Sequence, residues 1–106
     1  MKVGVVISSN DPETVWNAFR FANFALSSGD QVKVFLMGKG VEAENLDTEN
    51  FNIREQMQNF VDRGGEIMAC GTCLKLRRKE GNELCPFSTL KDMYQVVAWS
   101  DRLLTF

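Results

Sequence analysis

The chain has 106 residues, 44% hydrophobic and 25% charged, which predicts one folded domain over residues 1–106 and excludes disorder and collagen-like repeats. A net charge of −2 argues against nucleic acid as a partner, because phosphate contacts need a basic surface, and no apolar run approaches the ~18 residues that a membrane span requires. Histidine is absent, which excludes Ser-His-Asp and Cys-His catalysis and His-ligated metals and directs attention to the three cysteines.

The first third of the chain predicts a strand, a helix and a second strand. The β-branched run Val3–Ile7 is typical of a strand buried on both faces, and the N-terminus is too short for the apolar core of a signal peptide. Asp11 and Pro12 are typical of a helix start, and Gly29 of a helix end. Val32–Met37 is the second apolar run. The apolar face of the first helix comprises Val15, Ala18, Phe19, Ala22, Ala25 and Leu26.

The middle of the chain predicts a loop, a helix and a third strand. Gly38–Asn52 is polar and acid-rich, and we expect a loop long enough to act as a lid. An amphipathic helix follows, and Ile67–Ala69 supplies the strand. The apolar positions of that helix are Ile53, Met57, Phe60 and Val61.

The last third begins with the motif Cys70-Gly71-Thr72-Cys73. The basic segment Leu74–Glu80 predicts a short helix, and Gly81–Phe87 predicts a loop. Ser88 and Thr89 begin a final helix, with Asp92 placed as in a capping box, and Leu103–Phe106 ends the chain as a strand. The expected core face of the final helix comprises Leu90, Met93, Tyr94 and Val97.

This order of elements predicts an α/β fold: a mainly parallel sheet with helices on both faces, in flavodoxin-like layers. In such a sheet the loops that leave the carboxyl ends of the strands lie along one edge, where sites form. Ser8–Asn10, Gly38–Asn52 and Cys70–Cys73 are loops of this kind. The sequence therefore predicts a site that includes the cysteine pair.

The spacing of the pair has a chemical logic. A cysteine at a helix start lies near free backbone N–H groups, and nearby positive charge also favours the thiolate, which is the nucleophile. Gly71 is expected to let the backbone turn tightly and to leave the sulfur uncovered. The positive charge comes from Lys75, Arg77, Arg78 and Lys79.

Three interpretations of the cysteines remain open. Cys70 and Cys73 can be small buried hydrophobic residues, or half of a zinc site with Cys85 as a third ligand, or partners in thiol redox or sulfur transfer. No second pair completes four zinc ligands, so we favour thiol chemistry and expect no metal and no cofactor. Cys85, before Pro86, is either a resolving thiol or a loop cysteine without a role.

The segment Met68–Arg77, MACGTCLKLR, resembles the cysteine loop of the DsrE/DsrF/TusD group of DsrE-like proteins. The first strand, the helix after Ser88 and the ending Ser100–Phe106 are also similar, so the resemblance spans the chain. It implies a small α/β fold assembled as trimers or hexamers, in which the loop cysteine accepts sulfur as a persulfide and hands it on. It assigns that role to Cys70, whereas the second thiol, Cys73, departs from the single cysteine of many sulfur-relay members.

The leading hypothesis is a cytoplasmic sulfur carrier or sulfurtransferase that works with sulfur donor and acceptor proteins. The alternatives are a dithiol–disulfide oxidoreductase or redox sensor that uses Cys70 and Cys73, and a non-catalytic oligomeric binding module. A thioredoxin-type site is disfavoured because the pair follows the third strand instead of the first. The residues expected to support the site are Ser8, Asn10, Gly71, Thr72, Lys75, Arg77, Arg78 and Cys85.

Several large aromatic residues lie off the predicted core faces of their helices. Trp16, Phe21 and Phe24 point away from the apolar face of the first helix, and Trp99 lies off that of the last. Several such residues on the outside of a small chain indicate a partner surface, so we expect a homo-oligomer.

Overall fold

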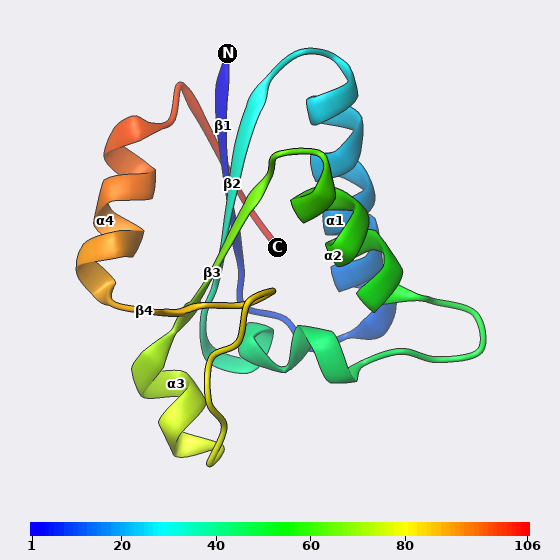
Figure 1. Cartoon of the computed structure of the whole chain (residues 1–106), viewed down its shortest axis with the longest axis vertical. Coiled ribbons are helices and arrows are strands. Elements are labelled where there is room, and N and C mark those ends of the chain that lie inside the picture. The colour runs from blue at the N-terminus through cyan, green and yellow to red at the C-terminus, as the bar shows by residue number, and fades with distance from the viewer.

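The chain folds around a five-stranded parallel sheet in the order β4-β3-β2-β1-β5 (Figure 1). The computed structural model describes all residues, 1–106. The strands are β1 (Lys2–Ile7), β2 (Gln31–Leu36), β3 (Glu66–Cys70), β4 (Phe87–Ser88) and β5 (Arg102–Thr105). The helices are α1 (Pro12–Ser27), the 3-10 helix η1 (Gly38–Asn45), α2 (Ile53–Asp62), α3 (Gly71–Leu76) and α4 (Leu90–Trp99).

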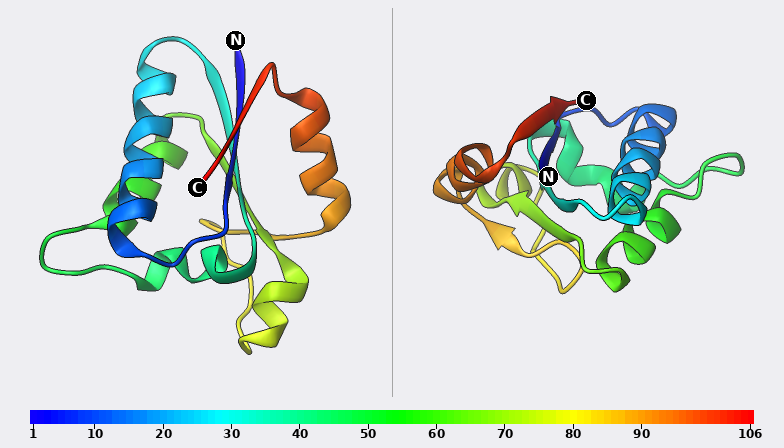
Figure 2. Two further views of the ribbon diagram at one scale, coloured as in Figure 1. Left: turned by 180° about the vertical axis from the view of Figure 1, so that it is seen from behind. Right: turned by 90° about the horizontal axis from the view of Figure 1, so that it is seen from above.

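Helices cover both faces of the sheet, with α1 and α2 on one face and α4 on the other (Figures 1 and 2). Strand residues alternate between these faces. Gly4 lies against Ser100 and Leu103 on the α4 side, so its neighbours Val3 and Val5 face α1 and α2. This arrangement confirms the predicted α/β fold with a parallel sheet and helices on both faces.

The predicted apolar faces of α1 and α2 are confirmed. Asp11 caps α1 by accepting a hydrogen bond from the Thr14 N–H at 2.9 Å, and Pro12 occupies the first turn, where no N–H is needed. Phe19 of α1 and Phe60 of α2 are fully buried and meet edge to face, with ring centroids 6.1 Å apart. The two helices thus form the core on their side of the sheet.

The predicted core face of α4 is wrong at Leu90, Tyr94 and Val97, whereas Met93 packs against the core. Val96 is the one residue of α4 that is buried, whereas Leu90 is 67% exposed and Tyr94 73% exposed. Val97 is exposed and Met93 is partly buried. Most of the apolar stripe of α4 therefore faces away from the sheet, and Val96 and Met93 provide the contact of this helix with the core.

Three segments differ from the predicted elements. The first half of the expected acidic lid is the helix η1, which buries Val41 and Ala43 against the core. The short helix begins at Gly71 instead of Leu74 and ends at Leu76, because Arg78 adopts a left-handed conformation with φ +54°. The expected loop 81–87 ends in the two-residue strand β4 beside β3.

The exposed aromatic residues are partly confirmed. Phe21 and Phe24 lie on the outside of α1. Trp16 is half-buried against Phe51, with ring centroids 5.2 Å apart, and Trp99 is half-buried beneath the side chain of Lys33. None of the helices is long and apolar enough to cross a lipid bilayer.

Candidate cysteine site

The site lies at the carboxyl edge of the sheet, where the segments after β1, β2 and β3 come together. The N–H of Met37, at the end of β2, donates to the carbonyl of Ile7, at the end of β1, at 3.0 Å. Gly40 lies directly against the same carbonyl, and any Cβ at this position would collide with it. This close approach fixes the start of η1 next to the end of β1.

The two cysteines of the pair have different surroundings. Cys70 is the last residue of β3 and the N-cap of α3, and only 5% of its surface is exposed. Cys73, in the first turn of α3, is half-buried. Cys70 is therefore largely shielded from solvent in the single chain, which differs from the expectation that Gly71 leaves the sulfur uncovered. No disulfide is present, and all three cysteines are free.

A backbone amide from a distant segment contacts Cys73. The N–H of Gly38 donates to the Cys73 Sγ at 3.2 Å, although the two residues are 35 positions apart in the sequence. Gly38 adopts a φ of +54°, a left-handed conformation that favours glycine. The turn after β2 thus presents a hydrogen-bond donor to the sulfur of the more exposed cysteine of the pair.

An ion pair that sequence reasoning missed lies beside Cys73. The Arg77 Nε donates to Glu42 Oε2 at 2.8 Å, and Arg77 Nη1 donates to the Cys73 carbonyl at 3.1 Å. The hydrogen bond from Arg77 holds the pKa of Glu42 below its ordinary 4.5, and the Asn10 side chain contributes in the same direction. The position of Glu42 in an acidic stretch after a strand could have marked it as a site residue. Its partner Arg77, however, lies far along the sequence, and no nearby residue indicates the pairing. The contact joins η1 to α3 and brings Asn10 to the site.

Gly71 has a different role from the one predicted. The ring of Phe87 lies directly over Gly71, so a Cβ there would collide with it. Lys75 in turn places its Nζ over the Phe87 ring, 5.4 Å from the centroid. Gly71 therefore admits an aromatic cover instead of leaving the cysteine loop open.

Cys85 is buried and chemically distinct from the pair. Burial is the main cause that raises the pKa of its thiol to about 12, and the nearby Glu44 carboxylate adds to the increase. Its N–H donates to Asn82 Oδ1 at 2.8 Å, and Asn82 contacts Glu44 at 3.0 Å. A thiol with this pKa is protonated at neutral pH, which does not suit the role of a resolving nucleophile.

The remaining predicted residues form no hydrogen bond to either sulfur. Ser8 is exposed and donates its hydroxyl to the Phe106 carbonyl at 3.4 Å. Thr72 and Lys75 are exposed on α3, and Arg78 is exposed just after it. No group of three or more Cys, Asp or Glu side chains is arranged to hold a metal ion.

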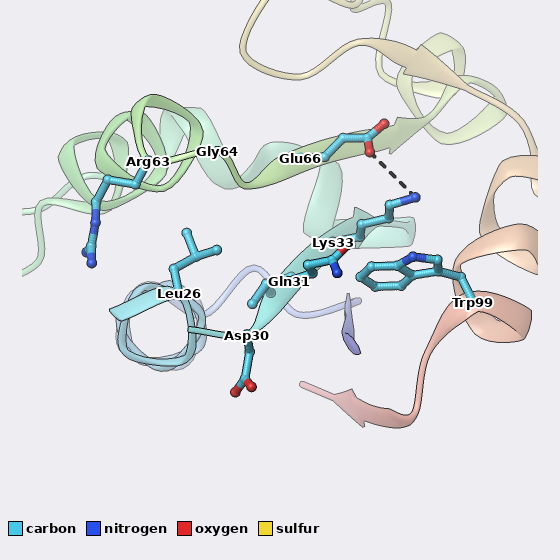
Figure 3. A pocket seen from close by; sticks show the side chains of 9 residues that line it. Leu26, Asp30, Gln31, Lys33, Arg63, Gly64, Glu66 and Trp99 are labelled. Atoms are coloured by element: carbon cyan, nitrogen blue, oxygen red, sulfur yellow. Dashed lines mark ion pairs between the residues drawn. The ribbon is translucent and has the colours of Figure 1, made fainter. Parts of the chain in front are cut away.

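A shallow pocket of about 280 Å³ opens at the opposite, amino-terminal edge of the sheet (Figure 3). Trp99, Lys33 and Glu66 line one side of it, and Lys33 Nζ lies 3.8 Å from a Glu66 carboxylate oxygen. Asp30 pairs with the amino-terminal nitrogen at 2.9 Å, and Arg63 with the Ser27 hydroxyl. Each of these charged groups has a polar partner, and no cysteine lines the pocket.

Sequence comparison identifies the family. A model of the DsrE/DsrF-like family matches residues 1–106. The chain belongs to this family. The match confirms the resemblance carried by the cysteine loop and by the two ends of the chain.

Similar proteins have no assigned function in their names. An uncharacterised protein of Methanocaldococcus jannaschii is 32% identical over 114 residues, covering 100% of both chains. One of Methanopyrus kandleri is 34% identical over 101 residues, covering 89% of this chain and 83% of that protein.

Solved structures confirm the fold. The ychN protein from E. coli superimposes with a TM-score of 0.85 at 22% identity, covering 100% of both chains. A conserved protein of unknown function from Bacteroides thetaiotaomicron gives a TM-score of 0.80 at 15% identity, covering 99% of this chain and 94% of that one. At these identities the likeness establishes the fold alone.

Proposed function

We propose that the protein is a sulfur carrier that accepts sulfane sulfur as a persulfide on the Cys70–Cys73 loop and passes it from a donor protein to an acceptor protein. The observation that carries the proposal is the half-buried Cys73 thiol, which receives the Gly38 N–H at the edge of a parallel sheet. Membership of the DsrE/DsrF-like family supports it, because the resemblance gives this loop a sulfur-accepting cysteine.

The chemistry needs only thiols. A loop thiolate attacks the outer sulfur of a donor persulfide, the sulfur–sulfur bond breaks, and the donor leaves as a thiolate. The acceptor thiolate then attacks the same outer sulfur, and the loop cysteine is regenerated. Backbone N–H groups suit this cycle, because they hydrogen-bond to anionic sulfur in both the thiolate and the persulfide form.

Mass spectrometry after incubation with a low-molecular-weight persulfide tests the proposal. In the wild-type chain we expect a mass change at the loop cysteines, either the gain of a sulfur atom or the loss of two hydrogens. The mass of the Cys70→Ser/Cys73→Ser double variant is expected to stay unchanged. Cys85→Ser serves as the matched control, because it removes a thiol of the same chain without altering the loop, and it should react like the wild type. A double variant that gains sulfur as fast as the wild type contradicts the proposal.

A dithiol–disulfide oxidoreductase or redox sensor is the second candidate, because the two thiols lie within one helical turn, at the N-cap and in the first turn of α3. Treatment with a mild oxidant in the absence of persulfide then yields a Cys70–Cys73 disulfide and a loss of two hydrogens. A chain that resists both persulfide and oxidant is instead a binding module.

We propose that the protein assembles as a homo-oligomer, a trimer or a hexamer, through α4 and β5. Leu90 and Tyr94 project outward from α4, Leu103 and Leu104 are exposed on β5, and β5 is an unpaired edge of the sheet. Apolar stripes and free strand edges of this kind are commonly covered by another chain. Sedimentation equilibrium tests the proposal: a Leu90→Glu/Tyr94→Glu variant sediments as a monomer, and a wild-type chain that is itself monomeric contradicts it.

We propose the cytoplasm as the compartment, because a relay that works through thiols needs a reducing environment. A donor and an acceptor protein in the same compartment complete the relay. Labelling of cysteines in intact cells tests this placement, because a cytoplasmic chain keeps its loop thiols reduced.

A further inference from the structure

The order in which the two loop thiols act can be derived from their positions. Cys73 is half-buried and receives the Gly38 N–H, so an incoming persulfide meets this sulfur first. Cys70 is only 5% exposed and belongs to the core, so a bulky donor cannot approach it while the loop keeps this conformation.

The two cysteines occupy the N-cap and the third position of α3, and the side chains at these two positions touch in α1, α2 and α4. Cys70 is the N-cap residue of α3 and Cys73 is the third helical residue. At the same two positions, side-chain atoms are 2.8 Å apart in α1, 3.0 Å apart in α2 and 3.0 Å apart in α4. The residue pairs are Asp11 and Thr14, Asn52 and Glu55, and Thr89 and Asp92.

The backbone conformation of Cys70 also allows its side chain to approach that of Cys73. Its φ and ψ angles are −57° and 116°, close to the −72° and 122° of the N-cap residue Asp11, whose side chain contacts that of Thr14. A disulfide requires Cβ atoms about 3.5–4.5 Å apart, which side chains in direct contact can provide. The backbone at Cys70 therefore allows a Cys70–Cys73 bond, although the Cys70 side chain makes no capping hydrogen bond in this conformation.

We propose that Cys73 receives the sulfur and that Cys70 then attacks the Cys73 persulfide, which forms a Cys70–Cys73 disulfide and releases the sulfur as hydrogen sulfide. This inference rests on the proposed function and deepens it. The loop then not only carries sulfane sulfur but can also reduce it to sulfide. Where an acceptor thiol arrives before Cys70 attacks, the sulfur passes on. Where none arrives, it leaves as sulfide.

The two steps balance. In the first step the Cys73 thiolate attacks the outer sulfur of the donor persulfide, the donor sulfur–sulfur bond breaks and the donor leaves as a thiol, with Cys73 as a persulfide. In the second step the Cys70 thiolate attacks the Cys73 Sγ, the bond from Sγ to the outer sulfur breaks, and this sulfur leaves as hydrogen sulfide. In sum, one donor persulfide and two cysteine thiols give one donor thiol, one disulfide and one hydrogen sulfide. The sulfane sulfur gains the two electrons that the cysteines lose, and a thiol reductant such as glutathione or a dithiol protein resets the pair.

Cys85 provides a built-in comparison. Its thiol is also buried, but the pKa of about 12 keeps it protonated, and it lies before β4 instead of on the turn that holds the pair. Removal of Cys85 therefore leaves both steps intact.

The test uses the reduced full-length chain, glutathione persulfide as the donor and two readouts, the sulfide released and the intact mass. Wild type and Cys85→Ser are expected to release one sulfide per chain and to lose two hydrogens. Cys70→Ser is expected to gain one sulfur atom on Cys73 and to release no sulfide. Cys73→Ser is expected to react at least tenfold more slowly than the wild type. Cys70→Ala is measured beside Cys70→Ser, because serine places a hydroxyl in the core, and circular dichroism checks that every variant is folded.

The outcomes separate this inference from the proposed function. A wild-type chain that keeps the added sulfur without releasing sulfide overturns the inference and leaves the carrier function standing. A Cys73→Ser chain that takes up sulfur on Cys70 at the wild-type rate also overturns it, since Cys70 is then the receiving thiol. If the wild-type chain neither gains sulfur nor releases sulfide, the proposed function fails as well.

Discussion

The two faces of the sheet differ in how their helices are used. On one face, α1 and α2 turn their apolar stripes inward and bury Phe19 and Phe60 completely. On the other face, α4 buries only Val96 and turns Leu90 and Tyr94 outward. The difference teaches that the α1/α2 face holds the single chain together, whereas the α4 face has apolar surface to spare for contact with another molecule.

The cysteine site is connected to the α4 face. Phe35 and Met68 are neighbours in the register of β2 and β3, and Lys33, two residues before Phe35, reaches Trp99 of α4. Because strand residues alternate, Cys70 lies on the same face as Met68. Another chain that covered α4 would therefore lie on the side of the sheet from which Cys70 extends.

The largest expected effect on stability lies on the α1/α2 face. Phe60→Ala removes a fully buried ring and is expected to lower the free energy of unfolding by about 3–5 kcal/mol. Chemical denaturation measures this loss. Phe24→Ala is the control on the same layer, because Phe24 is 71% exposed, and its effect should stay within about 0.5 kcal/mol. Equal losses for the two variants would show that the face is not packed as described.

The next largest effect is expected on the association of chains and not on the stability of a single chain. In a Leu90→Ala/Tyr94→Ala variant we expect the melting temperature to become independent of protein concentration, because subunit association stabilises the folded state by mass action. In dilute solution the variant and the wild type should unfold within about 0.5 kcal/mol of each other, as is usual for exposed positions. Thermal scans over a wide range of concentrations provide the measurement. A large loss in dilute solution would place this stripe inside the fold instead of at an interface.

The contrast between the faces also explains what the sequence predicts well. The start of α1 is encoded locally, by Asp11 and Pro12, and its apolar positions repeat at helical spacing, so the element and its buried face were predicted correctly. The stripe of α4 repeats equally well, but periodicity reports that a helix has an apolar face and not which neighbour covers it. The prediction therefore assigned Tyr94 to the core, although it points outward.

The sequence predicts where in the fold the site lies, but it does not predict which residues contact one another there. The order of strands and helices places the cysteine loop at the carboxyl edge, because parallel strands share their ends. The contacts of Gly38 with Cys73 and of Glu42 with Arg77 each join residues 35 positions apart, and nothing local to either partner encodes them. The burial of Cys70 likewise depends on how the core closes around the end of β3.

A smaller effect on the free energy of unfolding is expected at the contact between α4 and the start of β2. Lys33 Nζ lies 4.6 Å from the centroid of the Trp99 ring, and a cation in this position stabilises by about 0.5–1 kcal/mol. Lys33→Gln should lose about this much in chemical denaturation, since the exposed pair with Glu66, at 3.8 Å, adds little. Lys39→Gln, at an exposed lysine of η1, serves as the control. A Lys33→Gln variant as stable as the wild type would mean that the ring position does not depend on the cation.

The smallest expected effect is a dependence of stability on pH that arises from the ion pair at the site. Because the hydrogen bond from Arg77 lowers the pKa of Glu42 in the folded chain, this contact stabilises the fold fully above the ordinary value of 4.5. The contribution disappears as the pH falls through the lowered pKa, where the carboxylate takes up a proton in the folded state too. Melting temperatures of the wild type and of Glu42→Gln should therefore differ near neutral pH and converge in acid, whereas Glu49→Gln, at an exposed glutamate outside the site, should follow the wild type throughout. A constant difference across the acid range would assign the effect of the substitution to packing instead of charge, and the ion pair would then have no part in holding η1 against the cysteine loop.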